Sequence, residues 1–220
     1  MYLQDKLINK FEYFTMEELS NLFNTKNYLA PTTLSSSKDN SFMQYARSNP
    51  KSPIYQAIKA GSDFHKSIED GIGVDKRNKE LLDYFNTHIV PTISEVWAME
   101  KAVVSHRHGL KGVLDGVGIL KGRSTIWDYK KVNSLKSDKK LEGYFKQLAS
   151  YAICHNEMYG EVNGRIDQIA VIQIAGKPTD QISHKITIVK PVDLIDIKKK
   201  YIEETNEWFK TRKFPNPYDV

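Results

Sequence analysis

Asp115 and the triplet Asp128-Tyr129-Lys130 are the residues of this 220-residue chain whose types and spacing best suit chemistry. The triplet closes a strand-like run, and Asp115 lies in an apolar run just before it. Carboxylates are the ligands that hard divalent cations prefer, and such cations activate water. A lysine beside them could assist that water. The spacing therefore favours metal-assisted hydrolysis on two adjacent strands.

The acid-x-lysine pattern also occurs at residues 138–140 and 196–198, so the triplet alone is weakly specific. The first of these copies lies in a charged run that indicates a solvated helix start, and the second in a segment of helical period. Only Asp128 ends a strand-like stretch that follows another strand carrying an acid. A plain ion pair of Asp128 with Lys130 or Lys111, on a solvated sheet face, remains an alternative.

Strand alternation predicts which side chains near the triplet share a face, because residues two apart point the same way. Ile126, Asp128 and Lys130 would point to one side. Two acids among apolar neighbours are costly to bury unless something compensates their charge. A bound cation together with Lys130 would do so. On the preceding strand, the residues expected to share a face are Val113, Asp115, Val117 and Ile119.

Composition favours one soluble domain over residues 1–220, with a helical or irregular region over residues 1–60. The content is 40% apolar and 27% charged, and apolar runs fall short of the ~18 residues of a membrane span. The first residues lack a signal-peptide pattern. The single cysteine, Cys154, excludes an internal disulfide and a four-cysteine iron–sulfur or zinc site. An intracellular, cytoplasmic protein is expected, with Cys154 packed in a helix.

The net charge of +5 and the pI of about 9.0 suit a polyanionic partner, although a solvated surface explains each group of lysines equally well. One basic group follows the triplet and another lies near the C-terminus. The aromatic candidates for stacking on bases are Tyr2, Tyr13, Tyr28, Tyr144, Tyr159 and Trp127. The basic residues are Lys130, Lys131, Lys136, Lys139, Lys140 and Lys146, then 198–200 and 210–213.

The elements that would position these residues form a mixed α/β domain, a sheet covered by helices. Strands 113–120 and 124–130 form a hairpin across the turn at 121–123, and a further strand ends near Val104. A capping box at Thr15 opens a short helix, and helix 54–68 is interrupted at Gly61. The closing helix should turn Ile195, Tyr201 and Ile202 inward. The remaining elements are irregular chain over 28–50, helices 75–85, 141–160 and 192–208, and strands 165–174 and 185–189.

Five short motifs, in this order, resemble the PD-(D/E)XK nucleases of the RecB-nuclease type. The likeness is greatest to the mitochondrial genome maintenance exonucleases and their phage and bacterial relatives. It covers roughly residues 60 to 160 and implies a restriction-endonuclease-like mixed sheet flanked by helices. The motifs are Phe64-His65-x-x-Ile68-Glu69, Glu100, Gly112-x-x-Asp115, Asp128-x-Lys130 and Gln147-x-x-x-Tyr151.

The resemblance implies a role for each matching residue. Asp115, Asp128 and Lys130 would be catalytic, and both aspartates would hold Mg²⁺ or Mn²⁺. The backbone carbonyl of Tyr129 would be a further metal ligand. Glu100 and His65 would complete the metal shell. The residues expected to position substrate are Gln147, Tyr151 and Lys131, the first two on one helix face.

The expected activity is metal-dependent DNA exonuclease cleavage from single-stranded or frayed ends, in DNA repair or recombination. Replication or recombination proteins are candidate partners, and neither a membrane nor an iron–sulfur cluster is expected. The chain lacks the GxxxxGK[ST] loop of ATP-driven motors. Three alternatives remain: a structure-selective or site-specific endonuclease of the same fold, a catalytically silent nucleic-acid-binding module, and an interaction protein with a chance motif.

Overall fold

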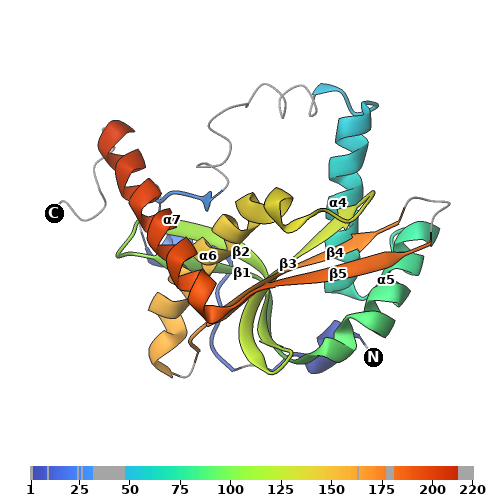
Figure 1. Cartoon of the computed structure of the whole chain (residues 1–220), viewed down its shortest axis with the longest axis horizontal. Coiled ribbons are helices and arrows are strands. Elements are labelled where there is room, and N and C mark those ends of the chain that lie inside the picture. The colour runs from blue at the N-terminus through green and yellow to red at the C-terminus, as the bar shows by residue number, and fades with distance from the viewer. Residues whose placement is uncertain are drawn as a thin grey trace.

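A five-stranded mixed sheet forms the centre of the protein (Figure 1). The computed structural model describes residues 2–8, 10–23, 25, 27–31, 48–162, 164–176 and 181–212. Spatial order follows chain order, and neighbouring strands are antiparallel except for the parallel pair β3 and β4. The strands are β1 (Ile93–Ser105), β2 (Leu110–Leu120), β3 (Arg123–Val132), β4 (Gln168–Ala175) and β5 (Ser183–Val189).

Helices cover both faces of the sheet, as Figure 1 shows. On one face, α4 (Pro53–Asp70) and α5 (Lys76–His88) enclose a core cluster that includes Phe64, Phe85 and Trp127. On the other, α6 (Glu142–Tyr159) and α7 (Pro191–Arg212) enclose a second cluster. The predicted mixed α/β sheet flanked by helices is therefore confirmed. The shorter elements are η1 (Leu3–Lys6), α1 (Met16–Leu22), η2 (Val90–Thr92), η3 (Asp138–Leu141) and η4 (Gly160–Val162).

The predicted hairpin is confirmed as β2 and β3, whose last pair is Leu120 with Arg123. Lys121 and Gly122 have φ values of 49° and 79°, which suits the two-residue turns that match the twist of antiparallel strands. A parallel neighbour cannot be reached by so short a turn. The chain therefore crosses from β3 to β4 through α6, which lies against the sheet.

The helix predicted from apolar spacing over 141–160 is α6, which ends at Gly160 as expected. Leu148 and Ala152 lie on its inner face, and Cys154 is a buried free thiol. The predicted strand ending near Val104 is β1. Among the described residues, no helix is long and apolar enough to cross a membrane.

Two details of the predicted helices are wrong. Gly61 does not interrupt its helix, because α4 continues through it and a helix interior tolerates a single glycine at a modest cost. Ile195 does not point inward, since 65% of its surface is exposed. Leu194 is buried in its place, while Tyr201 is buried as predicted. Of the irregular region expected over 28–50, residues 32–47 lie outside the described residues.

Candidate metal centre

Asp115 lies where the alternation of β2 breaks. Leu114 and Val117, three residues apart, belong to the same core cluster, so the strand changes face between them. The expectation that Val113, Asp115 and Val117 all share one face is therefore wrong: Val113 is 38% exposed, whereas Val117 is fully buried. Asp115 Oδ2 accepts a hydrogen bond from the Tyr129 amide at 3.1 Å, which ties β2 to β3 beyond their paired register.

Glu100 faces Asp115 from the neighbouring strand. The pairs Met99 with Gly116 and Lys101 with Leu114 place it opposite Asp115 in the register of β1 and β2. Its φ of 50° is unusual for a residue other than glycine and strains the backbone. Such strained positions cluster at functional sites, where the surrounding structure maintains them.

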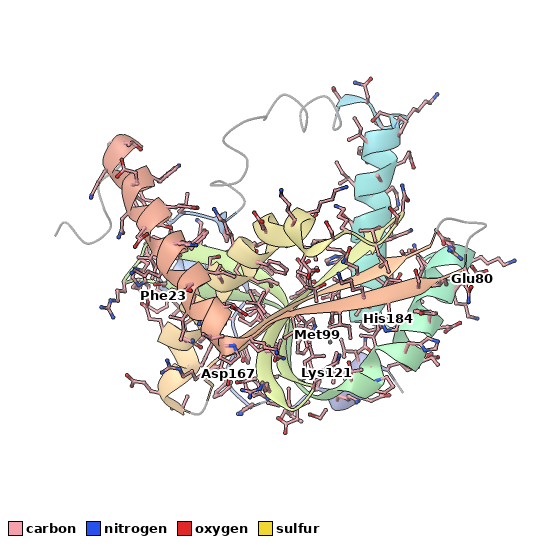
Figure 2. The ribbon with its side chains drawn as sticks, viewed as in Figure 1. Phe23, Glu80, Met99, Lys121, Asp167 and His184 are labelled. Atoms are coloured by element: carbon pink, nitrogen blue, oxygen red, sulfur yellow. The ribbon has the colours of Figure 1, made fainter. Side chains whose placement is uncertain are left out.

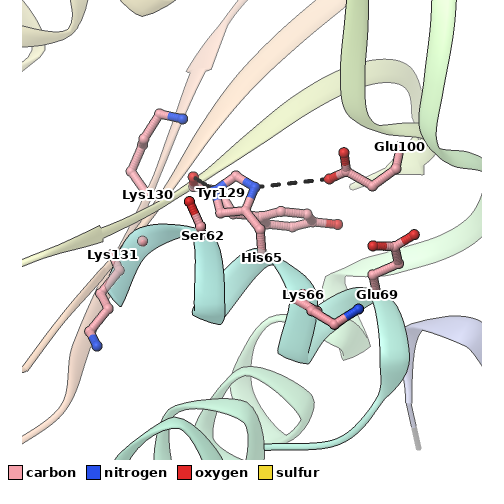
Figure 3. Close-up of a pocket in the computed structure, with 9 residues that line it drawn as sticks. Ser62, His65, Lys66, Glu69, Glu100, Tyr129, Lys130 and Lys131 are labelled. Carbon is pink, nitrogen blue, oxygen red and sulfur yellow. Dashed lines mark hydrogen bonds and ion pairs between the residues drawn. The ribbon is translucent and has the colours of Figure 1, made fainter. Parts of the chain in front are cut away.

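His65 comes from α4 and completes the group (Figure 3). Its Nε2 lies 2.8 Å from the carbonyl oxygen of Tyr129, and its Nδ1 lies 3.4 Å from Asp115 Oδ2 and 3.9 Å from Glu100 Oε1. A carbonyl oxygen only accepts, so Nε2 must carry a proton. In the neutral imidazole, the lone pair of Nδ1 would then face the two carboxylates, as in histidines that bind metals.

These three side chains can hold a cation. One ligand atom from each of His65, Glu100 and Asp115 lies within 4.8 Å of the other two. A nitrogen and two carboxylate oxygens suit Mn²⁺ and can serve Mg²⁺ when water fills the remaining positions. Asp128 lies outside this group of three. The predicted carbonyl ligand, Tyr129, receives the hydrogen bond of His65, so in this structure it orients the imidazole.

Asp128 and Lys130 form a buried ion pair on the α6 side of the site. Lys130 Nζ lies 2.7 Å from Asp128 Oδ1 and 5.2 Å from the ring centre of Tyr144. Asp128 is only 2% exposed, and none of the described residues offers a hydrogen bond to its buried Oδ2. The alternative of a solvated ion pair fails on this burial. An unpartnered buried carboxylate oxygen is costly and fits a place for a cation.

The charges of the site act strongly on one another. Burial, and then the Asp128 carboxylate, raise the pKa of Asp115 to about 7. Burial lowers the pKa of His65, but the interaction with the Glu100 carboxylate and the charge of Asp115 outweigh it, so this pKa is raised overall. Burial likewise opposes the charge of Lys130, whose pKa is still raised by Asp128 and Asp115. A bound divalent cation would offset the burial and the neighbouring negative charge that oppose ionisation of Asp115.

Gln147 and Tyr151 lie together on α6, as their spacing predicts. Gln147 Nε2 donates to Tyr151 Oη at 2.9 Å, and Tyr151 is nearly buried. The Tyr151 ring packs on Gly112, where an added Cβ would overlap it. Gly112 thus allows α6 to approach β2, and the Gly112-x-x-Asp115 motif combines this packing contact with a candidate metal ligand.

A cavity of about 450 Å³ opens beside His65 (Figure 3). Lys130 and Lys131 both line it but leave β3 in opposite directions. Burial lowers the pKa of Lys131. Ser62 and Lys66 also line the cavity and were not predicted as site residues. Ser62 lies three residues before His65 on α4, a spacing that puts both on one face and could have suggested Ser62, whereas Lys66 gave no such signal.

Two aromatic residues proposed for base stacking are unsuitable. Trp127 is completely buried beneath α4 and α5, and Tyr159 is largely buried on the other side of the sheet. Trp127 packs instead against Gly116, where a Cβ would overlap its indole.

Comparisons with known proteins do not show a family for this chain. No protein-family model matches the chain, and no curated protein matches it by sequence. One similar solved structure is that of a presumed exonuclease from Eubacterium rectale, with 12% identity, a TM-score of 0.47, and coverage of 90% of this chain and 88% of that one. Another, a protein designated SSO0001, shows 18% identity and a TM-score of 0.39, with coverage of 86% and 77%. At such values, neither likeness says what this chain does.

Proposed function

We propose that the protein is a metal-dependent DNA exonuclease with a restriction-endonuclease-like fold. The observation that carries the proposal is the meeting of His65, Glu100 and Asp115 beside the buried Asp128–Lys130 pair. These residues come from α4 and three adjacent strands, and each matches a motif of the PD-(D/E)XK resemblance. A chance motif would not be expected to assemble five separate residues around one point.

Different residues of the chain would bind the metal ion and stabilise the phosphate. A Mg²⁺ or Mn²⁺ ion, when bound, supplies an activated water and neutralises charge on the phosphate. His65, Glu100 and Asp115 would hold the ion, and Asp128, whose Oδ2 has no hydrogen-bond partner among the described residues, would contribute a further carboxylate. Lys130 would stabilise negative charge on the phosphate, since its ammonium is held by Asp128 at the edge of the cavity.

Single-turnover cleavage of end-labelled single-stranded DNA tests this proposal, with magnesium titrated by calorimetry. Asp115→Ala and Asp128→Ala should abolish cleavage while DNA binding persists. Lys130→Ala should leave metal binding largely intact and slow cleavage on the order of 10²-fold or more, as expected when an electrostatic group is lost.

The matched controls are the two other acid-x-lysine positions. Asp138 is exposed and paired with Lys185, and Asp196 is exposed on α7, so Asp138→Ala and Asp196→Ala should cost little. Full activity in Asp128→Ala, or equal losses in the controls, would contradict the assignment. Closed single-stranded circles should be spared, and their rapid nicking would favour the endonuclease alternative. Metal and DNA binding without cleavage would favour the silent binding module.

A further inference from the structure

A second cavity, of about 500 Å³, adjoins the one at the candidate metal centre. Glu69 of α4 lines both cavities. Met99 and Lys101 line the second cavity, and Glu100, which lies between them on β1, lines the first. A single strand of DNA that crosses the metal centre could therefore continue directly into the second cavity.

The N-terminal segment forms the outer wall of this cavity along the edge strand β1. Leu7 pairs with Val96 in parallel, and Phe14 pairs with Ala102 in antiparallel fashion. Between these two contacts, the described residues that line the cavity from this segment include Phe11, Glu12 and Tyr13. The cavity thus lies between the N-terminal segment and β1, open beside α4.

The wall that the N-terminal segment forms is aromatic, and ring packing and a hydrogen bond fix its side chains. Phe11 packs edge-on against Trp97, with ring centres 5.7 Å apart, and against Tyr13 at 5.9 Å. Tyr13 Oη is fixed by a 2.8 Å hydrogen bond with His155 Nε2. Trp97 is buried, whereas Phe11 is only half-buried and lines the cavity. One side of the Phe11 ring is stacked on Tyr159, with ring centres 5.2 Å apart, and Tyr13 is tied to His155. The remaining exposed part of the Phe11 ring is therefore the surface that we expect to meet a ligand.

The charges around the wall favour a base rather than a phosphate. Glu12 and Glu69 would repel a phosphate, but their carboxylates can accept hydrogen bonds from the exocyclic amino groups of bases. Lys101 lines the same cavity, and Lys10 lies with its Nζ 3.8 Å from the ring centre of Trp97. Aromatic rings flanked by cations are the usual means of holding single-stranded nucleic acid.

We propose that this cavity is a nucleobase subsite, in which one base next to the cleaved linkage stacks on Phe11. The inference rests on the proposed nuclease function and adds the part of the substrate that is recognised: an unpaired base. Paired bases are stacked within a duplex, so the subsite would select single-stranded or frayed ends.

The test is the binding of fluorescent single-stranded oligonucleotides with one free end, measured without divalent metal so that nothing is cleaved. Each oligonucleotide carries one abasic nucleotide at a successive position from that end. Wild type should lose affinity on the order of 10-fold at one position, because base–aromatic stacking contributes at about that level. Phe11→Leu should bind the intact strand about as weakly and be insensitive to that position.

Two variants guard against a merely structural effect. Phe11→Tyr keeps an aromatic ring and should retain the affinity and the position-dependent loss. Phe23→Leu removes an exposed ring that packs on His106, away from Met99 in Figure 2, and should bind as wild type does. Thermal melting of each variant reports whether it is folded.

The outcomes separate the two proposals. If wild type cleaves DNA with magnesium but Phe11→Leu keeps the wild-type affinity and abasic profile, the subsite is overturned and the nuclease stands. An equal loss in Phe23→Leu also overturns the subsite. If wild type neither binds nor cleaves DNA, both proposals fail together.

Discussion

The hydrogen bond between His65 and the Tyr129 carbonyl decides what the candidate metal centre can do at the residue scale. It fixes the proton on Nε2 and directs Nδ1 toward Glu100 and Asp115. Without a cation, a proton held among His65, Glu100 and Asp115 reduces the repulsion between the two carboxylates. A cation would have to displace that proton, so binding should depend on pH.

The affinity for Mn²⁺ should therefore fall as the pH falls below about 7. Asp115, whose pKa is raised to about 7, is protonated below that value, and a proton on it competes with the cation. The expected loss is about tenfold per pH unit for one displaced proton, with a plateau above pH 8. Calorimetry between pH 6 and 8, in buffers of different protonation enthalpy, measures both affinity and proton release. An affinity independent of pH over this range would refute the arrangement.

At the element scale, the site depends on irregularities in regular structure. β1 adopts a left-handed conformation at Glu100, and β2 changes face between Leu114 and Val117. Both departures lie beside Asp115, and together they bring side chains of two strands to the histidine of α4. In two perfectly regular strands, simple alternation alone would set the directions of the Glu100 and Asp115 side chains.

Glu100→Gly separates the effect of the positive φ at residue 100 on stability from the contribution of the Glu100 carboxylate to metal binding. Glycine adopts a positive φ freely, whereas other residues pay about 1–2 kcal/mol there, so the free energy of unfolding should rise by up to about 1 kcal/mol after the entropy of glycine is counted. Metal affinity and cleavage should fall. Lys121→Gly is the control, since Lys121 has a φ of 49° in a hairpin turn and should gain stability without losing cleavage. Equal cleavage by both variants would remove Glu100 from the site.

Gly112→Ala tests the contact between β2 and α6. The added methyl group would overlap the Tyr151 ring, and overpacking of this kind typically costs about 1–3 kcal/mol. Gln147 should shift with Tyr151, so cleavage should slow as well. Gly143→Ala is the control, because its Cβ would meet nothing within 4 Å and alanine favours helix by about 1 kcal/mol. Urea denaturation and cleavage rates compare the two; unchanged behaviour of Gly112→Ala would contradict the packing argument.

Periodicity and turn residues were sufficient to predict the elements but not their irregularities. The β2–β3 hairpin followed from apolar alternation and Gly122, and α6 from its three-and-four spacing. Ile195 was misplaced because α7 has apolar residues on more than one side, and only packing selects Leu194. The face change of β2 between Leu114 and Val117 has no counterpart in the apolar pattern, which continues through Val113, Val117 and Ile119 as in a regular strand. Motif order selected the candidate residues that the fold brings together, while the burial of Asp128 and the packing role of Gly112 could be seen only in the fold.

At the scale of the whole molecule, the sheet places the candidate site between two layers of helices. His65 and Lys66 reach it from α4 on one face, while Lys130 approaches α6 on the other. Lysines on both sides of the sheet therefore border one opening, which fits a net charge of +5. A polyanion that crosses this opening would contact both layers.

Binding of single-stranded DNA should accordingly weaken steeply with salt, because each phosphate contact releases counterions. About four contacts would give a slope near −3 in log affinity against log salt, or roughly a 50-fold loss between 50 and 200 mM.

Lys66→Ala and Lys131→Ala should each reduce the magnitude of this slope by about 0.7, since both lysines line the cavity. Lys185→Ala should not, because Lys185 lies on β5 and is not among the residues that line the cavity. Anisotropy titrations at four salt concentrations give these slopes. A flat wild-type slope would mean that phosphates are not the main contact, and equal slopes in all three variants would place the DNA elsewhere on the surface.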